Sequence, residues 1–270
     1  MRMQNSQLSK KDIEKVQEQA RDKLIEYRKL SDVIGTQIFS ILEKESKVLY
    51  YPLEDQKVWG FSEIIKGKSF VCINTSIPYE KQVFAAAHEL YHLWYGSSGE
   101  IMLSEDNQEP DSDKEVELWA NRFAAEFLVN EQLLLQEMRT YGIDKENIEM
   151  KDIVRLANIF VVPYRTMVKR FYEIGIFKDK TYNYYMAYSD EQAEIWKNRL
   201  GLSVPIRKEK IAFSVLIDLA MDLYEKNQIT YEKLEYVLNM AELTPSEMGI
   251  EIPVEYYPPT DEELDAIMEE

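Results

Sequence analysis

The two histidines of this 270-residue chain lie four residues apart, with a glutamate directly after the first. They are His88 and His92, in the sequence AAAHELYHLW that begins at Ala85. Positions i and i+4 of a helix share one face, so both imidazoles can bind one metal ion from the same side. Glu89 stands next to the first histidine, where a carboxylate can act as general base on a water molecule. The spacing therefore predicts a catalytic metal site with His88 and His92 as ligands and Glu89 as base.

A pair of core histidines is the alternative interpretation of this spacing. A buried imidazole needs a hydrogen-bond partner, and two on one helix face need two. We favour the metal site because histidine occurs nowhere else in the chain and because the order HExxH matches what metal-dependent hydrolysis requires. Zinc is the expected ion, and these residue types also suit another divalent metal such as manganese.

A third protein ligand is expected, because a catalytic zinc site ordinarily has three and keeps one position for water. There is no third histidine, and Cys72 falls in an expected strand upstream, so a carboxylate is the best choice. The next expected helix offers Glu115, Glu117 and Glu126. We choose Glu117, since small residues at positions 120, 124 and 125 allow this helix to pack closely on the histidine helix. Glu115 is expected to form a capping box with Ser112, and Glu126 stays open as an alternative.

Composition limits the class of protein. The net charge is −17, from 32 basic and 49 acidic residues, which opposes general nucleic-acid binding and suits a basic partner. A single cysteine excludes an internal disulfide and indicates a reducing compartment. Residues 1–11 are polar, so we expect no signal peptide, and no run of 18 apolar residues predicts a membrane span. We expect a soluble, cytoplasmic protein.

The pattern of apolar residues predicts a mostly helical α+β fold. Helices are expected over 9–28, with Ser9 as N-cap, and over 31–44. Three short strands of a small antiparallel sheet are expected at 48–51, 58–61 and 69–73. The histidine helix should follow, capped by Ser76 or Thr75, with Pro78 in its first turn and Gly96 after its end. An acidic connection, 97–111, should lead to a helix from 112 to 129.

The second half of the chain is predicted to be helical. Residues 151–175 indicate two helices joined by a turn at 161–163, and 211–224 with 231–240 indicate a helical hairpin. Capping boxes are expected at Ser189, Thr244 and Thr260, the last in an acidic tail that ends the chain. A tyrosine cluster at 182–188 is interpreted as core or strand rather than as a binding surface.

A DNA-binding regulator is the main competing function. Residues 151–180 contain seven basic and three acidic residues inside an acidic chain. Arg165, Lys169 and Arg170 fall on the expected second helix, where a recognition helix would present them. The apolar residues between them indicate that much of this segment is core, so DNA binding through 151–180 is the less favoured interpretation. A salt-dependent gel shift would distinguish the two.

Two segments together resemble the ImmA/IrrE family of metallo-endopeptidases. One is FAAAHELYH from Phe84, and the other is ELWANRFAAEFL from Glu117, similar to the family's E-x-x-A-N-x-F-A-A-x-L-L pattern. Gly60, and Ile73 with Asn74, fit its strands, and the resemblance extends loosely over residues 30–178. The sequence departs from the family at Val129, where a Met-Pro-like ending is common.

The resemblance implies a gluzincin-like zinc endopeptidase with His88, His92 and Glu117 as ligands and Glu89 as catalytic base. It implies a zincin-like core over 46–148, in which the sheet packs on the HExxH helix. N-terminal helices (1–45), a helix-turn-helix-like segment (149–180) and a helical C-terminal region with an acidic tail (181–270) complete the expected organisation. It also implies cleavage of a helix-turn-helix repressor, which would release stress or mobile-element genes. A non-cleaving, metal-binding antirepressor is the remaining alternative, and the intact Glu89 opposes it.

Overall fold

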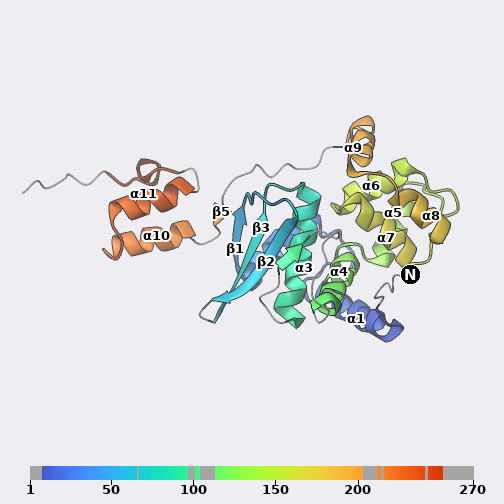
Figure 1. Cartoon of the computed structure of the whole chain (residues 1–270), viewed down its shortest axis with the longest axis horizontal. Coiled ribbons are helices and arrows are strands. Elements are labelled where there is room, and N and C mark those ends of the chain that lie inside the picture. Colours follow the sequence, from blue (N-terminus) through green and yellow to red (C-terminus); the bar gives the residue numbers. More distant parts are fainter. Residues whose placement is uncertain are drawn as a thin grey trace, which may run out of the picture. The chain divides into compact units, whose positions relative to one another are not determined.

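The computed structural model describes residues 8–65, 67–96, 101–103, 113–202, 212–213, 216–240 and 243–251. The chain divides into two compact units, residues 1–214 and 215–270. The described part of the first unit combines a mixed five-stranded sheet with helices α1 to α9, and that of the second contains α10 and α11 (Figure 1). The fold is thus α+β and mostly helical, as the sequence predicts.

The elements of the first unit are α1 (Lys10–Glu26), η1 (Gly35–Gln37), α2 (Ile38–Glu45), β1 (Lys47–Tyr51), β2 (Val58–Ile65), β3 (Lys68–Asn74), α3 (Tyr79–Tyr95), β4 (Ile101–Leu103), α4 (Asp113–Leu128), α5 (Glu131–Thr140), α6 (Met150–Phe160), α7 (Tyr164–Glu173), α8 (Asp179–Met186), α9 (Asp190–Arg199) and β5 (Ala212–Phe213). Those of the second unit are α10 (Leu216–Glu225), α11 (Tyr231–Met240) and η2 (Pro245–Met248).

The sheet has the order β4-β2-β3-β1-β5 and is mixed, so the prediction of a purely antiparallel sheet is wrong. β2 and β3 form an antiparallel hairpin whose turn contains Gly67, at φ +75°. β1 pairs in parallel with β3, with Val48 opposite Val71. Strands β1 and β3 run in the same direction, and β2 runs in the opposite one. Because β3 lies between β1 and β2 in the sheet, it pairs in parallel with β1 and antiparallel with β2.

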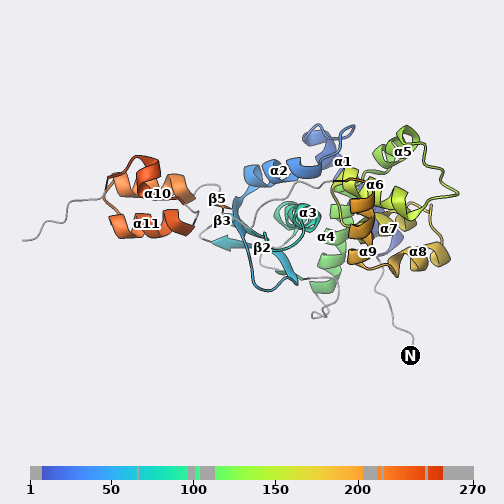
Figure 2. The ribbon, with the colours of Figure 1, turned by 90° about the horizontal axis from the view of Figure 1, so that it is seen from above.

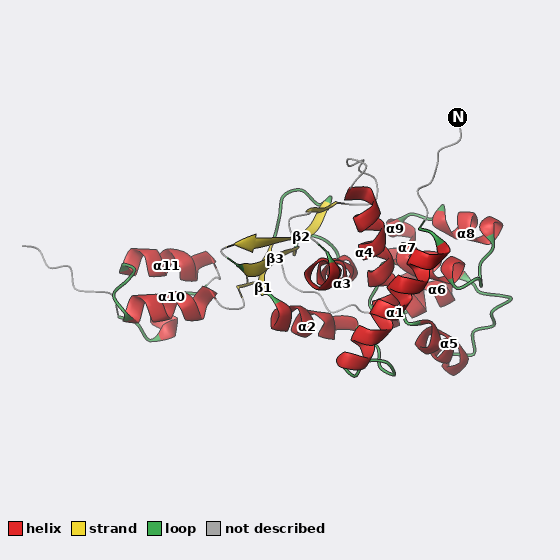
Figure 3. Ribbon diagram, turned by 90° about the horizontal axis from the view of Figure 1, so that it is seen from below, coloured by secondary structure: helices red, strands yellow, loops and turns green. Residues whose placement is uncertain are grey.

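Helix α3 lies between the sheet and α4 (Figures 2 and 3). It contacts β2 and β3 on one side, α4 on another and α2 on a third, so most of its residues are buried. Ala85, Ala86 and Ala87 on α3, and Ala120 and Ala124 on α4, have no exposed surface. These methyl side chains allow the sheet and α4 to approach α3 closely, as the small residues of both helices predict.

Helix α1 begins as predicted, with the Ser9 hydroxyl accepting from the backbone N–H of Asp12 in a capping box. It packs along α4, where Lys15 stacks on Trp119 with its Nζ 4.5 Å from the ring centroid. The helix predicted over 31–44 is shorter than expected. Gly35 has a φ of +47°, which interrupts helical geometry, so the regular helix α2 begins only at Ile38.

The N-terminus of α3 differs from the prediction that Ser76 or Thr75 caps it. Pro78 occupies the N-cap position, and no side chain caps the helix. The Ser76 hydroxyl instead donates to the backbone oxygen of Leu53, and it also contacts Asn74, which lies at the end of β3. Ser76 therefore links the β1–β2 connection, through Leu53, to the end of β3, through Asn74. Gly96 follows the last residue of α3 as predicted.

The helices after α4 largely follow the sequence pattern. α6 and α7 are joined by a short turn in which Val161 has a φ of +53°. Ser189 forms its predicted capping box at α9, and Thr244 forms one at η2. The tyrosines expected to lie in core or strand belong to helix α8 and its end: Tyr185 is buried and Tyr184 is exposed.

In the second unit, α10 and α11 pack on each other through a small core formed by Ala220, Leu234, Val237 and Leu238. The apolar helix predicted from residue 211 begins at Leu216, and 212–213 form β5 instead. Several predictions lie outside the described residues. They are the Ser112 cap, the acidic connection apart from 101–103, and the tail from 252, including Thr260.

Candidate metal centre

Helix α3 carries His88, Glu89 and His92, and all three side chains are buried. One helical turn separates the two histidines, so their rings lie side by side with centroids 4.8 Å apart. The two Nε2 atoms are 3.0 Å apart. The structure therefore turns the same ring nitrogen of each histidine toward one point.

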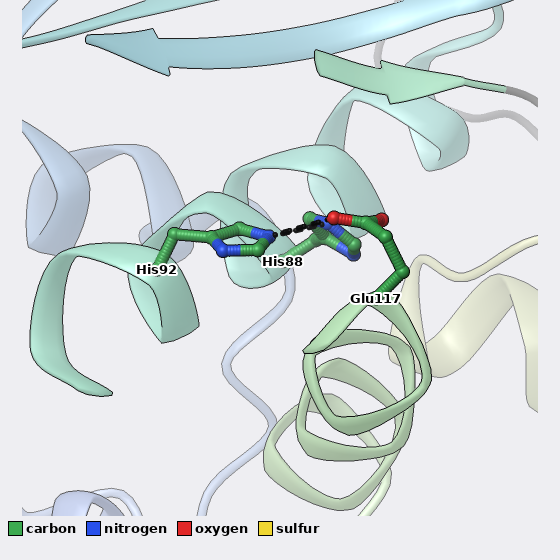
Figure 4. A group of neighbouring side chains, drawn as sticks. All are labelled: His88, His92 and Glu117. Carbon is green, nitrogen blue, oxygen red and sulfur yellow. Dashed lines mark hydrogen bonds and ion pairs between the residues drawn. The ribbon is translucent and has the colours of Figure 1, made fainter. Parts of the chain in front are cut away.

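Glu117 reaches this point from α4, as Figure 4 shows. One of its carboxylate oxygens lies 3.2 Å from His88 Nε2, and the other lies 3.2 Å from His92 Nε2. The donor atoms of the three residues all lie within 4.8 Å of one another. Glu117 is thus the carboxylate that the structure brings to the histidines.

The other two carboxylates considered from the sequence are elsewhere. Glu115 is exposed on the first turns of α4. Glu126 is buried, but it accepts hydrogen bonds from Arg122 and Arg170 on the side facing α7. Within the described ranges, His88, His92 and Glu117 are the one group of three histidine, cysteine or acidic residues that converges.

The charge state of Glu117 reflects this convergence. Burial alone would raise its pKa, but hydrogen bonds and charge attraction from His88 and His92 outweigh that effect and lower the pKa to about 2. Glu117 is therefore an anion at neutral pH. Two imidazole nitrogens and one anionic oxygen form the set of donors that zinc prefers, so these residues fit such an ion.

Glu89 places its carboxylate close to Gly60 of strand β2. Its carboxylate has no exposed surface, and neither oxygen makes a hydrogen bond of ordinary geometry within the described part of the chain. Burial raises its pKa, an effect that His88, His92 and the nearby Ser62 hydroxyl partly offset. Gly60 of β2 is a close neighbour, because a Cβ there would lie 3.5 Å from Glu89 Oε1, an ordinary contact, and 3.0 Å from the Cys72 carbonyl oxygen, a tight one. A buried carboxylate beside the histidine pair suits a general base that acts on water.

Asn121 is a neighbour of the site that sequence reasoning did not assign. Its Oδ1 lies 3.2 Å from Nδ1 of His88, the ring nitrogen that faces away from the carboxylate of Glu117. The signal in the sequence is its spacing, since it follows Glu117 by four residues, one helical turn. That spacing became informative only once α4 was known to face α3.

Comparison with protein families agrees with this geometry. Residues 43–172 match the family model described as the IrrE N-terminal-like domain, of the peptidase family M78. This segment is similar to the metallopeptidases of the ImmA/IrrE family. The part that matches the ImmA/IrrE model includes the sheet strands β1 to β3 and both helices of the site.

None of the curated proteins matches the chain. No described helix of the chain has the length and apolar character needed to cross a bilayer.

Proposed function

We propose that this protein is a zinc-dependent endopeptidase in which His88, His92 and Glu117 bind the metal and Glu89 is the catalytic base. One observation carries the proposal: two Nε2 atoms and the Glu117 carboxylate converge from two helices, with a buried glutamate beside them. The family assignment supports the peptidase class. The same donor set would also accept another divalent metal.

A zinc ion bound by these three residues would lower the pKa of water and polarise a peptide carbonyl. Glu89 accepts a proton from the attacking water, whose oxygen forms a bond to the carbonyl carbon. The C–N bond then breaks, and Glu89 delivers the proton to the departing amine. Its burial-raised pKa favours the first of these steps, the uptake of the proton from water.

The proposed substrate is a protein, and we favour a helix-turn-helix repressor whose cleavage releases stress or mobile-element genes. The net charge of −17 suits a basic, DNA-binding partner. The single cysteine suits a reducing compartment such as the cytoplasm.

Direct DNA binding by residues 151–180 is less well supported. Arg170, one of the basic residues expected on a recognition surface, has no exposed surface and pairs with Glu126 and Glu173. Arg165 lies near Asp190 of α9, with 3.6 Å between Nε and the carboxylate. The α6–α7 pair therefore presents fewer free cations than the sequence indicates.

The deciding experiment compares new protein N-termini in host cells that express the wild type, Glu89→Gln or Glu63→Gln. Glu63 is an exposed residue of β2 and serves as the matched control. We expect a new N-terminus with the wild type and with Glu63→Gln, and none with Glu89→Gln, although all three bind zinc. Cleavage by Glu89→Gln at the wild-type rate would refute the general-base assignment. No cleavage by any of them, under stress or without it, would favour a non-cleaving antirepressor.

A further inference from the structure

We propose that Asn121 is a positioning residue that holds His88 in the orientation and tautomer needed to bind the metal. The proposal rests on the metal centre of the proposed function and adds a fourth residue to it. Asn121 does not touch the reacting atoms in this scheme. It acts through the imidazole of His88.

Two side chains of helix α4 contact the His88 ring, one at each of its nitrogen atoms. Nε2 lies 3.2 Å from a carboxylate oxygen of Glu117, and Nδ1 lies 3.2 Å from Oδ1 of Asn121. Glu117 and Asn121 are one turn apart on α4, just as His88 and His92 are one turn apart on α3. Each helix thus presents an i, i+4 pair to the other across the α3–α4 contact.

The chemistry of the amide oxygen determines which ring nitrogen carries the proton. A neutral imidazole has one N–H donor and one lone-pair acceptor, and an amide oxygen only accepts. The contact with Asn121 Oδ1 therefore requires the proton on Nδ1 of His88. The lone pair then lies on Nε2, which faces Glu117 and His92. A histidine that binds a metal commonly donates its second N–H to such an acceptor, which fixes the ring and strengthens the ligand.

The surroundings of α4 favour a fixed position for the amide. Ala120 and Ala124 are fully buried on either side of it, so α4 lies close to α3 at this turn. At the end of the helix, Arg170 of α7 donates to Glu126 and to the backbone oxygen of Val129. A helix held at its end and packed along its length can present Asn121 at one position.

The test measures zinc affinity by competition with a chelator, which needs no substrate. Asn121→Leu keeps the branched shape and the number of heavy atoms of the side chain but accepts no hydrogen bond, whereas Asn121→Asp retains an acceptor at the same place. Asn158→Leu on α6 is the matched control, because it removes a partly buried asparagine outside the site. Thermal unfolding of the metal-free proteins checks that all variants are folded.

We expect Asn121→Leu to bind zinc roughly 10- to 100-fold more weakly than the wild type, and Asn121→Asp to restore the affinity. Asn158→Leu should bind like the wild type. Wild-type affinity in Asn121→Leu would overturn the proposal, and so would a loss in Asn121→Asp as large as in Asn121→Leu. A protein that shows the expected pattern and yet cleaves nothing would contradict the proposed peptidase while supporting this role of Asn121.

Discussion

Arg170 of α7 forms a buried, bidentate ion pair with Glu126 of α4. Its Nη1 lies 2.9 Å from one carboxylate oxygen, its Nη2 bonds the other, and its Nε donates to the backbone oxygen of Val129 at 2.9 Å. Gln17 of α1 also donates to Glu126. One carboxylate therefore joins three helices, and it belongs to the same helix that carries Glu117.

Removing one partner of this pair should destabilise the protein strongly. Arg170→Met leaves the Glu126 carboxylate buried with one strong donor fewer, and we expect a loss of about 3–5 kcal/mol in the free energy of unfolding. Urea unfolding monitored by circular dichroism gives this value. Arg165→Met, on the exposed face of the same helix, is the control and should change stability by less than about 0.5 kcal/mol. A loss in Arg170→Met no larger than in this control would contradict the structural role of the pair.

Zinc binding should depend on Glu117 and not on Glu115, its neighbour on α4. Glu117→Ala removes the anionic carboxylate that both histidines face, so we expect no stoichiometric zinc after gel filtration in dilute chelator. Glu115→Ala, exposed on the same helix, should retain one zinc per chain. Metal content measured by atomic emission distinguishes the variants. Retention of zinc by Glu117→Ala would remove this residue from the ligand set.

Gly60 should tolerate a methyl group poorly. In Gly60→Ala the new Cβ would lie 3.0 Å from the Cys72 carbonyl oxygen, a backbone atom, and close to Glu89. We expect a loss of about 1–3 kcal/mol in the free energy of unfolding, because the Cβ overpacks against the backbone of β3. Urea unfolding measures this loss, and Glu63→Ala on the exposed part of the same strand should show none. Wild-type stability in Gly60→Ala would show that the approach of β3 to Gly60 does not require a glycine.

The contact between α9 and α3 should weaken at high pH. Burial alone would lower the pKa of Lys197, but the carboxylates of Glu80 and Glu194, 2.6 and 3.1 Å away, outweigh it and raise the pKa. The folded state thus holds this proton more tightly than the unfolded chain. The stabilisation is present at neutral pH and is lost as the pH rises through the raised pKa.

Lys197→Met tests this contribution. The difference in unfolding free energy between the wild type and Lys197→Met should be largest at neutral pH and should shrink above about pH 10.4, the ordinary value for lysine. Lys10→Met changes a fully exposed lysine and should show no such dependence. A difference that stays constant up to pH 11.5 would contradict the role of the ion pair.

Local patterns in the sequence were sufficient for most helices and for one side of the site. His88, Glu89 and His92 lie on one helix, so their spacing alone predicts that they act together. The same holds for the capping boxes of Ser9 and Ser189, whose partners are three residues away. The choice of Glu117 needed a further assumption, that α4 faces α3, which the small residues of both helices made reasonable.

Long-range relationships were beyond the sequence pattern. The parallel pairing of β1 with β3 was missed because strand order depends on which distant segments pair, and the alternation of residues within each strand does not record this. Arg170 was expected among surface cations, since a helical pattern reveals which face is apolar but not that an arginine meets a buried Glu126. Asn121 was missed because its partner, His88, lies on another helix, and a pattern within α4 does not reveal that contact.

The sequence by itself determined the helix that carries two imidazoles and a base, because three residues within five positions have their relative geometry set by the helical repeat. Only the tertiary structure decided which carboxylate joins them and which amide holds the first ring. Those partners lie 25 to 33 residues away in sequence, and packing of α4 against α3, with its far end held by Arg170, brings them to the site.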